Sequence, residues 1–244
     1  MLLHAEEQRY TSVYLNSYPQ TVVEGITAPA DWDVSEWLTA VGLVGVGAGL
    51  YVFDEDINRL VLDNRSGFTS DISHFGKQFG EGKYMFPAAA LTALGGYIFD
   101  SDKTTDTGLL CIKSFLLANG LTTSLKFLTQ RERPYEEKGK KFYNGNGFAL
   151  NRDSFPSGHA TVAWSIAPII AAQYKEHVWV APLAYSCAGF TSYSRMHDNK
   201  HWASDVFAGS LIGYFTAKLT LQSTNRLQVL PNSDAKGFSF RFQL

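Results

Sequence analysis

The sequence predicts a single all-α domain, and three observations support this fold class. Six apolar segments have the length of helices, further apolar residues recur at helical spacing, and only one stretch alternates as a strand would. The six segments are 37–53, 84–99, 107–125, 160–172, 178–192 and 206–222. With 244 residues, the chain is long enough to bury a sizeable core.

The chain divides into an extension, a helical domain and a tail. Residues 1–36 are polar and rich in Tyr without a clear period, so we predict an irregular N-terminal extension there. Residues 37–222 form the helical domain, which contains no internal repeat and no low-complexity linker. Residues 223–244 form a C-terminal tail, in which GFSFRFQL predicts a lone strand or an extended segment.

An amphipathic stretch lies between the first two apolar segments. Its apolar residues at helical spacing are Ile57, Leu60, Val61, Phe68, Ile72, Phe75 and Phe79. Such a stripe usually packs against a bundle, and it can also lie on a membrane surface. Both interpretations stay open.

The apolar segments are short for membrane spans, which need about 20 predominantly apolar residues. Segment 37–53 contains four glycines, and Lys113 and Lys218 interrupt two other segments. The mean hydropathy of the chain is −0.10. We therefore favour buried helices of a soluble or membrane-peripheral bundle over spans, although six such segments are also typical of a compact six-span protein.

Charge and cysteine content exclude some classes of function. The formal net charge is −2, so no global basic field recruits nucleic acid. Cys111 and Cys187 lie in apolar stretches, where we expect free thiols, while a disulfide between them stays open. Their spacing is not that of a metal site. The start, MLLHAEEQ, is too short for a signal peptide but could be the remnant of one.

Three short polar motifs accompany the helical pattern. They are KFLTQRERP (residues 126–134), PSGH (156–159) and SRMHDNKHWASD (194–205). Each has an ordinary explanation by itself, because a charged run is usually a solvated helix end and a single histidine is more often structural than catalytic. Together, however, they supply the different parts of one site.

The first part is a binding site for an anion. A phosphoryl group in transfer spreads negative charge over its oxygens, which cations and backbone donors stabilise. Lys126, Arg133 and Arg195 provide three cations. We expect Ser157 and Gly158 in the first turn of a helix over 156–172, where free N–H groups and the positive helix end favour an anion.

The second part is a pair of histidines. His201 and Asp205 are four residues apart in a segment that continues as helix, so we expect them on one face and within reach of each other. A carboxylate bonded to one ring nitrogen leaves the other nitrogen free to attack. His159, beside the anion site, is placed to protonate a leaving oxygen and later to activate water.

The order and spacing of these motifs resemble the signature of the type 2 phosphatidic acid phosphatase superfamily. That superfamily includes bacterial class A acid phosphatases and vanadium haloperoxidases. The resemblance covers residues 126–209 directly. It implies a helical bundle of the acid phosphatase and vanadium haloperoxidase type, with residues 37–222 as the phosphatase domain and the motif core at 126–209.

The resemblance also implies roles for residues. His201 matches the histidine that forms a phosphohistidine, Asp205 the aspartate that orients it, and His159 the acid and base. The positions that bind substrate phosphate in the family match Lys126, Arg133, Ser157, Gly158 and Arg195. Arg131 and His197 fall on variable positions and are assigned no catalytic role. His4, His74 and His177 have no such context and are predicted to be structural or at the surface.

The predicted activity is metal-free hydrolysis of phosphomonoesters or pyrophosphates. The substrate is predicted to be lipid-linked: phosphatidic acid, phosphatidylglycerol phosphate, lipid A or a polyprenyl pyrophosphate. No cofactor is expected, and vanadate should inhibit. Alternatives are a broad-specificity soluble acid phosphatase, a vanadium-dependent haloperoxidase and a non-enzymatic membrane-associated protein.

The expected partners are the phosphorylated substrate and a membrane surface, without nucleic acid, and the resemblance suggests the bacterial envelope or periplasm. The polar segment 135–153 is expected to rim the pocket or to form a surface loop.

Overall fold

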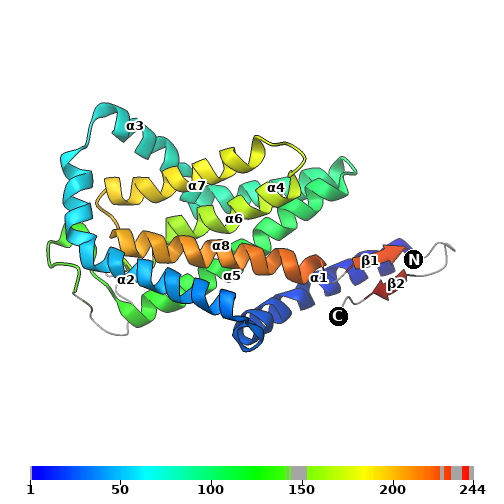
Figure 1. The fold of residues 1–244 in the computed structure, drawn as a ribbon. Coiled ribbons are helices and arrows are strands. Elements are labelled where there is room, and N and C mark those ends of the chain that lie inside the picture. The colour runs from blue at the N-terminus through cyan, green and yellow to red at the C-terminus, as the bar shows by residue number, and fades with distance from the viewer. Residues whose placement is uncertain (1, 142, 144–152, 226–227, 232–237, 242–244) are drawn as a thin grey trace.

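The structure is a computed structural model that describes residues 2–141, 143, 153–225, 228–231 and 238–241 (Figure 1). The helices are α1 (Leu2–Thr27), α2 (Val34–Asp63), α3 (Gly67–Gly76), α4 (Gly82–Ile98), α5 (Asp102–Thr129), α6 (Gly158–Gln173), α7 (Val180–His197) and α8 (Ala203–Asn225). Short 3₁₀ helices are η1 (Ala28–Asp31), η2 (Lys77–Gly80) and η3 (Pro134–Glu136), and two strands follow, β1 (Gln228–Pro231) and β2 (Phe238–Arg241). The all-α class is confirmed, and each predicted apolar segment lies within or overlaps a helix.

Helix α6 lies at the centre of the bundle, with α5, α7 and α8 packed around it (Figure 1). Its buried residues are mostly small or hydroxylated, including Ala160, Thr161, Ala163 and Ser165. Small side chains let helices approach closely, because little volume separates their backbones. The bundle is therefore tight where the three motifs meet.

Two glycines of α8 show how close this packing is. A Cβ atom added to Gly209 would lie 2.4 Å from the carbonyl oxygen of Ser157, and one added to Gly213 would lie 2.5 Å from that of Thr161. No side chain fits at either distance. The absence of side chains at these two positions thus lets α8 lie directly against the start of α6.

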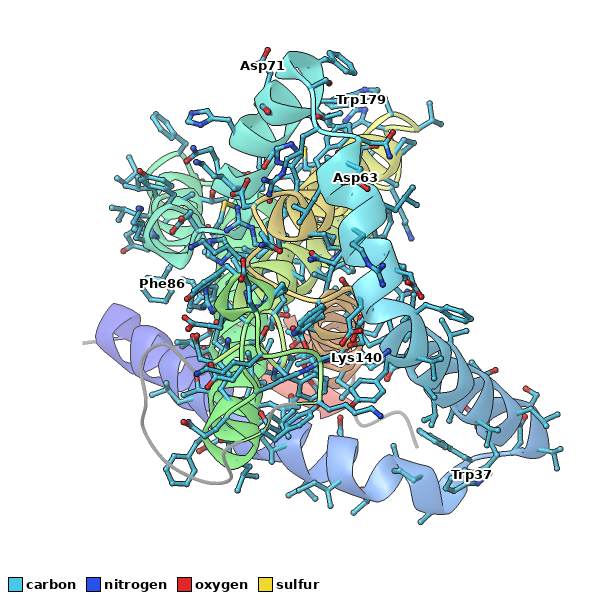
Figure 2. The ribbon with its side chains drawn as sticks, turned by 90° about the vertical axis from the view of Figure 1, so that its left-hand side faces the viewer. Trp37, Asp63, Asp71, Phe86, Lys140 and Trp179 are labelled. Atoms are coloured by element: carbon cyan, nitrogen blue, oxygen red, sulfur yellow. The ribbon has the colours of Figure 1, made fainter. Side chains whose placement is uncertain are left out.

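Helix α2 is not buried, contrary to the expectation from sequence. It begins in a capping box formed by Asp33 and Glu36, and Asp54 is its only buried residue. Its apolar side chains face outward, as Val44 does with 73% of its surface exposed. Figure 2 shows α2 along one edge of the molecule, with Trp37 near its outer end.

Two helices, α2 and α5, are long and apolar enough to cross a membrane, by length and composition. None of the apolar window of α2 is buried within the protein, whereas 39% of the window of α5 is. Helix α2 is longer than the apolar segment 37–53, because the apolar pattern continues through Ile57, Leu60 and Val61 to the end of this 30-residue helix.

The N-terminal region is a helix rather than an irregular extension. Helix α1 packs against α8 and α5 through hydroxyl groups. The Tyr14 hydroxyl donates to the Leu109 carbonyl at 2.8 Å, and the Thr21 hydroxyl donates to Ser223 Oγ at 2.7 Å. Apolar periodicity does not reveal these contacts, because they are hydrogen bonds of hydroxyl groups.

The remaining expectations have mixed outcomes. The stretch GFSFRFQL contains β2, which pairs antiparallel with β1 and is therefore not a lone strand. In the amphipathic stretch, Phe68 and Phe75 of α3 are exposed, and Phe75 also contacts Phe79 edge to face. Cys111 and Cys187 are free thiols, as expected.

Candidate active site

The three motifs meet at one end of the bundle, on the left in Figure 1. Because α5 to α8 alternate in direction, the end of α5, the start of α6, the end of α7 and the start of α8 all lie at this end. Lys126 lies in the last turn of α5, His159 in the first turn of α6, Arg195 in the last turn of α7 and Asp205 in the first turn of α8. The fold thus gathers residues that are up to 79 positions apart in the sequence.

His201 precedes α8 and is almost completely buried. Its Nδ1 atom lies 2.7 Å from the backbone carbonyl oxygen of Ser154. A carbonyl oxygen only accepts hydrogen bonds, so Nδ1 carries the proton of the neutral ring and Nε2 keeps its lone pair. Burial, together with the positive charges of Lys126 and Arg133, lowers the pKa of His201 well below its ordinary 6.5.

Asp205 does not bond directly to His201, contrary to the expectation from their spacing. Its Oδ2 atom is 3.9 Å from His201 Nδ1, beyond hydrogen-bond distance. Instead, Oδ2 accepts from Ser154 Oγ at 2.5 Å and from the Trp202 N–H at 2.9 Å. Asp205 therefore holds Ser154, and the Ser154 carbonyl in turn holds the imidazole ring.

Arg131, which the sequence analysis left without a role, lies fully buried beneath Asp205. Its Nη1 atom donates to Asp205 Oδ1 at 2.5 Å, and its Nη2 atom donates to Asp54 Oδ2 at 2.8 Å. Asp54 also accepts hydrogen bonds from the N–H and the hydroxyl of Ser204, at 2.9 and 2.5 Å. This buried network, Asp54–Arg131–Asp205, ties α2 to the start of α8.

The sequence did carry a signal for this network. Asp54 interrupts the apolar run of α2, and a charge buried at such a position requires a partner. Its partner is 77 residues away in the sequence, so no local pattern connects the two.

Lys126 and Arg133 share a carboxylate partner, Asp153. Arg133 donates to Asp153 Oδ1 through Nε at 2.9 Å and approaches the same atom through Nη2 at 2.7 Å. Lys126 Nζ lies 3.5 Å from Oδ2 and also donates to the Asp153 carbonyl. A carboxylate thus lies where the two cations would meet a phosphate. Of the predicted rim 135–153, residues 142 and 144–152 lie outside the described residues.

Arg195 is held from α7 and α3. It donates to Asp198 Oδ2 at 3.0 Å and to Ser194 Oγ at 3.0 Å. Ser73 of α3 donates to the other oxygen of Asp198 at 2.8 Å. The cation is therefore fixed in position by a carboxylate that is itself held by a second helix.

The start of α6 differs in part from the expectation. The helix begins at Gly158, and Ser157 is its N-cap residue rather than part of the first turn. The Ser157 N–H donates to the carbonyl of Asp205 at 2.9 Å, so this donor is already used. The Ser157 hydroxyl is buried without a hydrogen-bond partner in the described structure. A Cβ atom added to Gly158 would lie 3.8 Å from Lys126 Cε, an ordinary van der Waals contact, so Lys126 packs beside this turn.

His159 lies beside a carboxylate that the motifs do not contain. Its Nε2 atom is 3.2 Å from Glu81 Oε1. Burial and the positive charge of Arg195 lower the pKa of His159, and Glu81 acts in the opposite direction. Glu81 lies between η2 and α4, far from the motifs in sequence, so spacing gave no sign of it.

His197 and His177 take no part in this arrangement. His197 is buried beside Asp198, with 3.4 Å between Nδ1 and Oδ1, and its carbonyl accepts from Arg65. His177 is exposed at the far end of α6. In the part of the chain that the structure describes, no three His, Cys, Asp or Glu residues gather as ligands for a metal ion.

The chain is similar to known proteins over most of this architecture. It is 27% identical to a lipid A 1-phosphatase of Porphyromonas gingivalis over 180 residues, which are 71% of this chain and 36% of the relative. It is 25% identical to an undecaprenyl-diphosphatase of Sulfolobus acidocaldarius over 173 residues, which are 70% of this chain and 78% of the relative. The chain thus spans about a third of the first relative and most of the second.

Two solved structures share the fold. The crystal structure of Aquifex aeolicus LpxE matches with a TM-score of 0.54 and 26% identity, over 70% of this chain and 95% of that one. That of a transmembrane PAP2-type phosphatidylglycerolphosphate phosphatase from Bacillus subtilis matches with a TM-score of 0.60 and 21% identity, over 77% of this chain and 96% of that one. The family model of the PAP2 superfamily matches residues 107–228, which contain all three motifs. The chain therefore belongs to the PAP2 superfamily, whose signature its motifs resemble.

Proposed function

We propose that this protein hydrolyses phosphate monoesters or pyrophosphates of lipids through a phosphohistidine on His201. The observation that carries the proposal is the state of His201, whose Nδ1–H donates to a backbone carbonyl while Nε2 keeps a lone pair among cations. A neutral imidazole with one nitrogen held and the other free is a nucleophile. Lys126, Arg133 and Arg195 would bind the phosphoryl oxygens and stabilise their charge in the transition state.

The reaction then has two displacements. In the first, Nε2 of His201 attacks phosphorus, the bond from phosphorus to the leaving oxygen breaks, and His159 gives its proton to that oxygen. In the second, His159 takes a proton from a water molecule as the water attacks phosphorus, and the phosphorus–nitrogen bond breaks. Inorganic phosphate leaves, and both histidines return to their starting states.

Lipid-linked substrates are favoured by the relatives and by the surface of the molecule. The names of the relatives refer to lipid A, undecaprenyl diphosphate and phosphatidylglycerolphosphate. The apolar faces of α2 and α4 are exposed, with Val44, Leu91 and Ile98 each exposed by more than half. So large an apolar surface marks contact with a membrane or a partner. We propose that α2 and α5 lie in a bilayer. The end of the bundle where the three motifs meet, called the charged end below, would then lie at the bilayer surface.

Membrane association is supported by these relatives and by the two apolar helices. We propose that this membrane belongs to the bacterial envelope and that the charged end faces the periplasm. A broad-specificity phosphatase acting on soluble esters is the second candidate, because the three cations bind phosphate whatever it is attached to.

The test is phosphate release in EDTA by the detergent-purified full chain. A soluble phosphomonoester, phosphatidic acid, phosphatidylglycerol phosphate, lipid A and a polyprenyl pyrophosphate are compared, with His201→Ala as the control. We expect turnover of at least one lipid, in excess of the soluble ester, and none by the variant.

Preference for the soluble ester would contradict the lipid assignment and favour the second candidate. Activity lost in EDTA and restored by a divalent ion would contradict the roles given to the side-chain cations. Turnover by His201→Ala would remove His201 as the nucleophile.

A further inference from the structure

Glu81 is a carboxylate at the site that belongs to none of the three motifs. Its Oε1 atom is 3.2 Å from Nε2 of His159, and 29% of each side chain is exposed. The Nε2 atom itself is shielded from solvent and has no hydrogen-bond partner in the described structure, so its contact with Glu81 is that of an ion pair within hydrogen-bond distance. Glu81 therefore faces a ring nitrogen of His159 that solvent does not reach.

The backbone holds Glu81 firmly at this distance. A Cβ atom added to the preceding Gly80 would lie 2.5 Å from Thr191 Cγ2 and 2.8 Å from His159 Cβ, so η2 packs directly against α6 and α7. The Thr191 hydroxyl donates to the carbonyl of Gly76 at 2.6 Å, which ties the end of α3, just before η2, to α7. The segment that leads into Glu81 is thus held by buried contacts with α6 and α7.

We propose that Glu81 is a positioning residue for His159, accepting the Nε2 proton so that Nδ1 faces the leaving oxygen of the substrate. A carboxylate has no proton to give when ionised, so a bond to it requires that Nε2 carry hydrogen. The Nδ1 atom is then the one that donates its proton to the leaving group and takes one from water. The proposal rests on the proposed function.

The charges around His159 show what Glu81 adds. Arg195 of α7 and Arg133 after α5 both disfavour the imidazolium form of His159. A positive charge on His159 in turn lowers the pKa of His201. Glu81 favours the imidazolium. Burial raises the pKa of Glu81 itself, but the bond to His159 and the charges of His159, Lys83 and Arg195 outweigh burial and lower it. Glu81 therefore stays ionised in mildly acid solution and keeps His159 protonated to a higher pH.

The experiment compares Glu81→Gln with wild type on two detergent-dispersed substrates that share a long alkyl tail, an alkyl phosphate and a nitroaryl phosphate. The alkyl oxygen needs a proton to leave, whereas the nitroaryl oxygen leaves readily without one. We expect kcat/KM to fall about 10- to 100-fold for the alkyl phosphate, which is the range for a lost orienting partner and is less than the full contribution of a general acid. For the nitroaryl phosphate we expect a change of less than about threefold.

The pH profile gives the second readout. Without Glu81, the alkaline limb of kcat/KM for the alkyl phosphate should move to lower pH, because His159 loses its proton more easily. Glu81→Asp should recover part of the activity. Glu176→Gln, at an exposed glutamate paired with Lys103, is the matched control and should leave both readouts unchanged.

Equal loss on the two substrates, or an alkaline limb that does not move, would overturn the role of Glu81. Thermal unfolding of each variant distinguishes such a result from misfolding, and Glu81→Asp carries the test if Glu81→Gln does not fold. If wild type hydrolyses neither ester nor any lipid phosphate, it is the proposed function that fails.

Discussion

Two of the cations buried in this bundle, Arg131 and Lys113, have different surroundings. Arg131, at the charged end, donates to two carboxylates, Asp54 and Asp205. Lys113, in the middle of α5, donates to two hydroxyls, Ser17 Oγ at 2.9 Å and Ser223 Oγ at 3.1 Å. The first cation balances buried charge beside the proposed nucleophile. The second joins α1 and α8 to α5 by neutral contacts, so the two should differ in what their removal costs.

The largest effect should come from Arg131→Met. This change leaves the carboxylates of Asp54 and Asp205 buried without their shared cation, and breaking a buried ion pair typically costs about 3–5 kcal/mol of unfolding free energy. Because Asp205 holds Ser154 and thereby His201, we also expect kcat to fall about 100-fold or more.

The measurement is thermal unfolding and phosphate release in one detergent. Asp54→Asn should have a smaller effect on both, since Arg131 keeps Asp205. Arg59→Met is the control, because Arg59 pairs with Asp56 at the exposed surface of α2. Equal behaviour of Arg131→Met and Arg59→Met would show that the buried network has no bearing on the site.

The second prediction concerns pH at the charged end. The pKa of His201 is lowered well below 6.5, and that of His159 is lowered as well. His201 must be neutral to attack, which requires a pH above its pKa, and His159 must be protonated to donate, which requires a pH below its pKa. Both conditions are met together only on the acid side, so kcat/KM should be highest below about pH 6.5.

A profile of kcat/KM against pH between 4 and 9 measures this optimum. An optimum on the alkaline side of neutrality would contradict the assignment of His159 as the acid. Lys113→Met should leave the profile unchanged, because Lys113 belongs to the other buried cluster.

The third and smaller effect is expected at Asp153, whose carboxylate occupies the two cations that would bind phosphate. Asp153→Asn should free Arg133 and Lys126, so inorganic phosphate and vanadate should inhibit at concentrations about two- to fivefold lower. That factor corresponds to the ~0.5–1 kcal/mol of a partly exposed ion pair. Inhibition constants at low salt measure it, with Asp56→Asn as the control. Weaker inhibition would show that Asp153 orients the cations rather than competing for them.

The smallest effect is expected from Lys113→Met. Both hydroxyls keep other partners, since Ser17 Oγ donates to the Tyr14 carbonyl at 2.6 Å and Ser223 Oγ donates to that of Thr220 at 3.1 Å. We expect kcat to change by less than about twofold and unfolding free energy by less than ~1 kcal/mol. A large loss of activity would contradict the separation of the two buried cations.

Apolar spacing and short motifs could be predicted from sequence, whereas polar contacts between helices could not. The helices of the bundle followed from apolar spacing, and the motifs brought His159, His201, Lys126, Arg133 and Arg195 to attention. Helix α1 did not follow, because the residues that join it to the bundle include Tyr14 and Thr21, whose hydroxyl hydrogen bonds leave no apolar period.

The supporting residues could not be predicted for a different reason. Asp54 and Glu81 meet the motifs only through the packing of α2 and η2, over separations that no spacing encodes. The four-residue spacing of His201 and Asp205 did bring them close, but His201 lies before the helix begins. Its ring therefore bonds to the Ser154 carbonyl, and Asp205 acts on it through Ser154.

The most direct test of the account is to trap phosphate on the protein. His159→Ala is mixed with a nitroaryl phosphate, quenched in alkaline denaturant and digested for mass spectrometry. Transfer to His201 needs no proton for this leaving group, whereas release from His201 needs the base that the variant lacks. The account predicts phosphate on the peptide that carries His201, and none when His201 is also changed to Ala. Phosphate on another residue, or turnover without any phosphorylated protein, would contradict it.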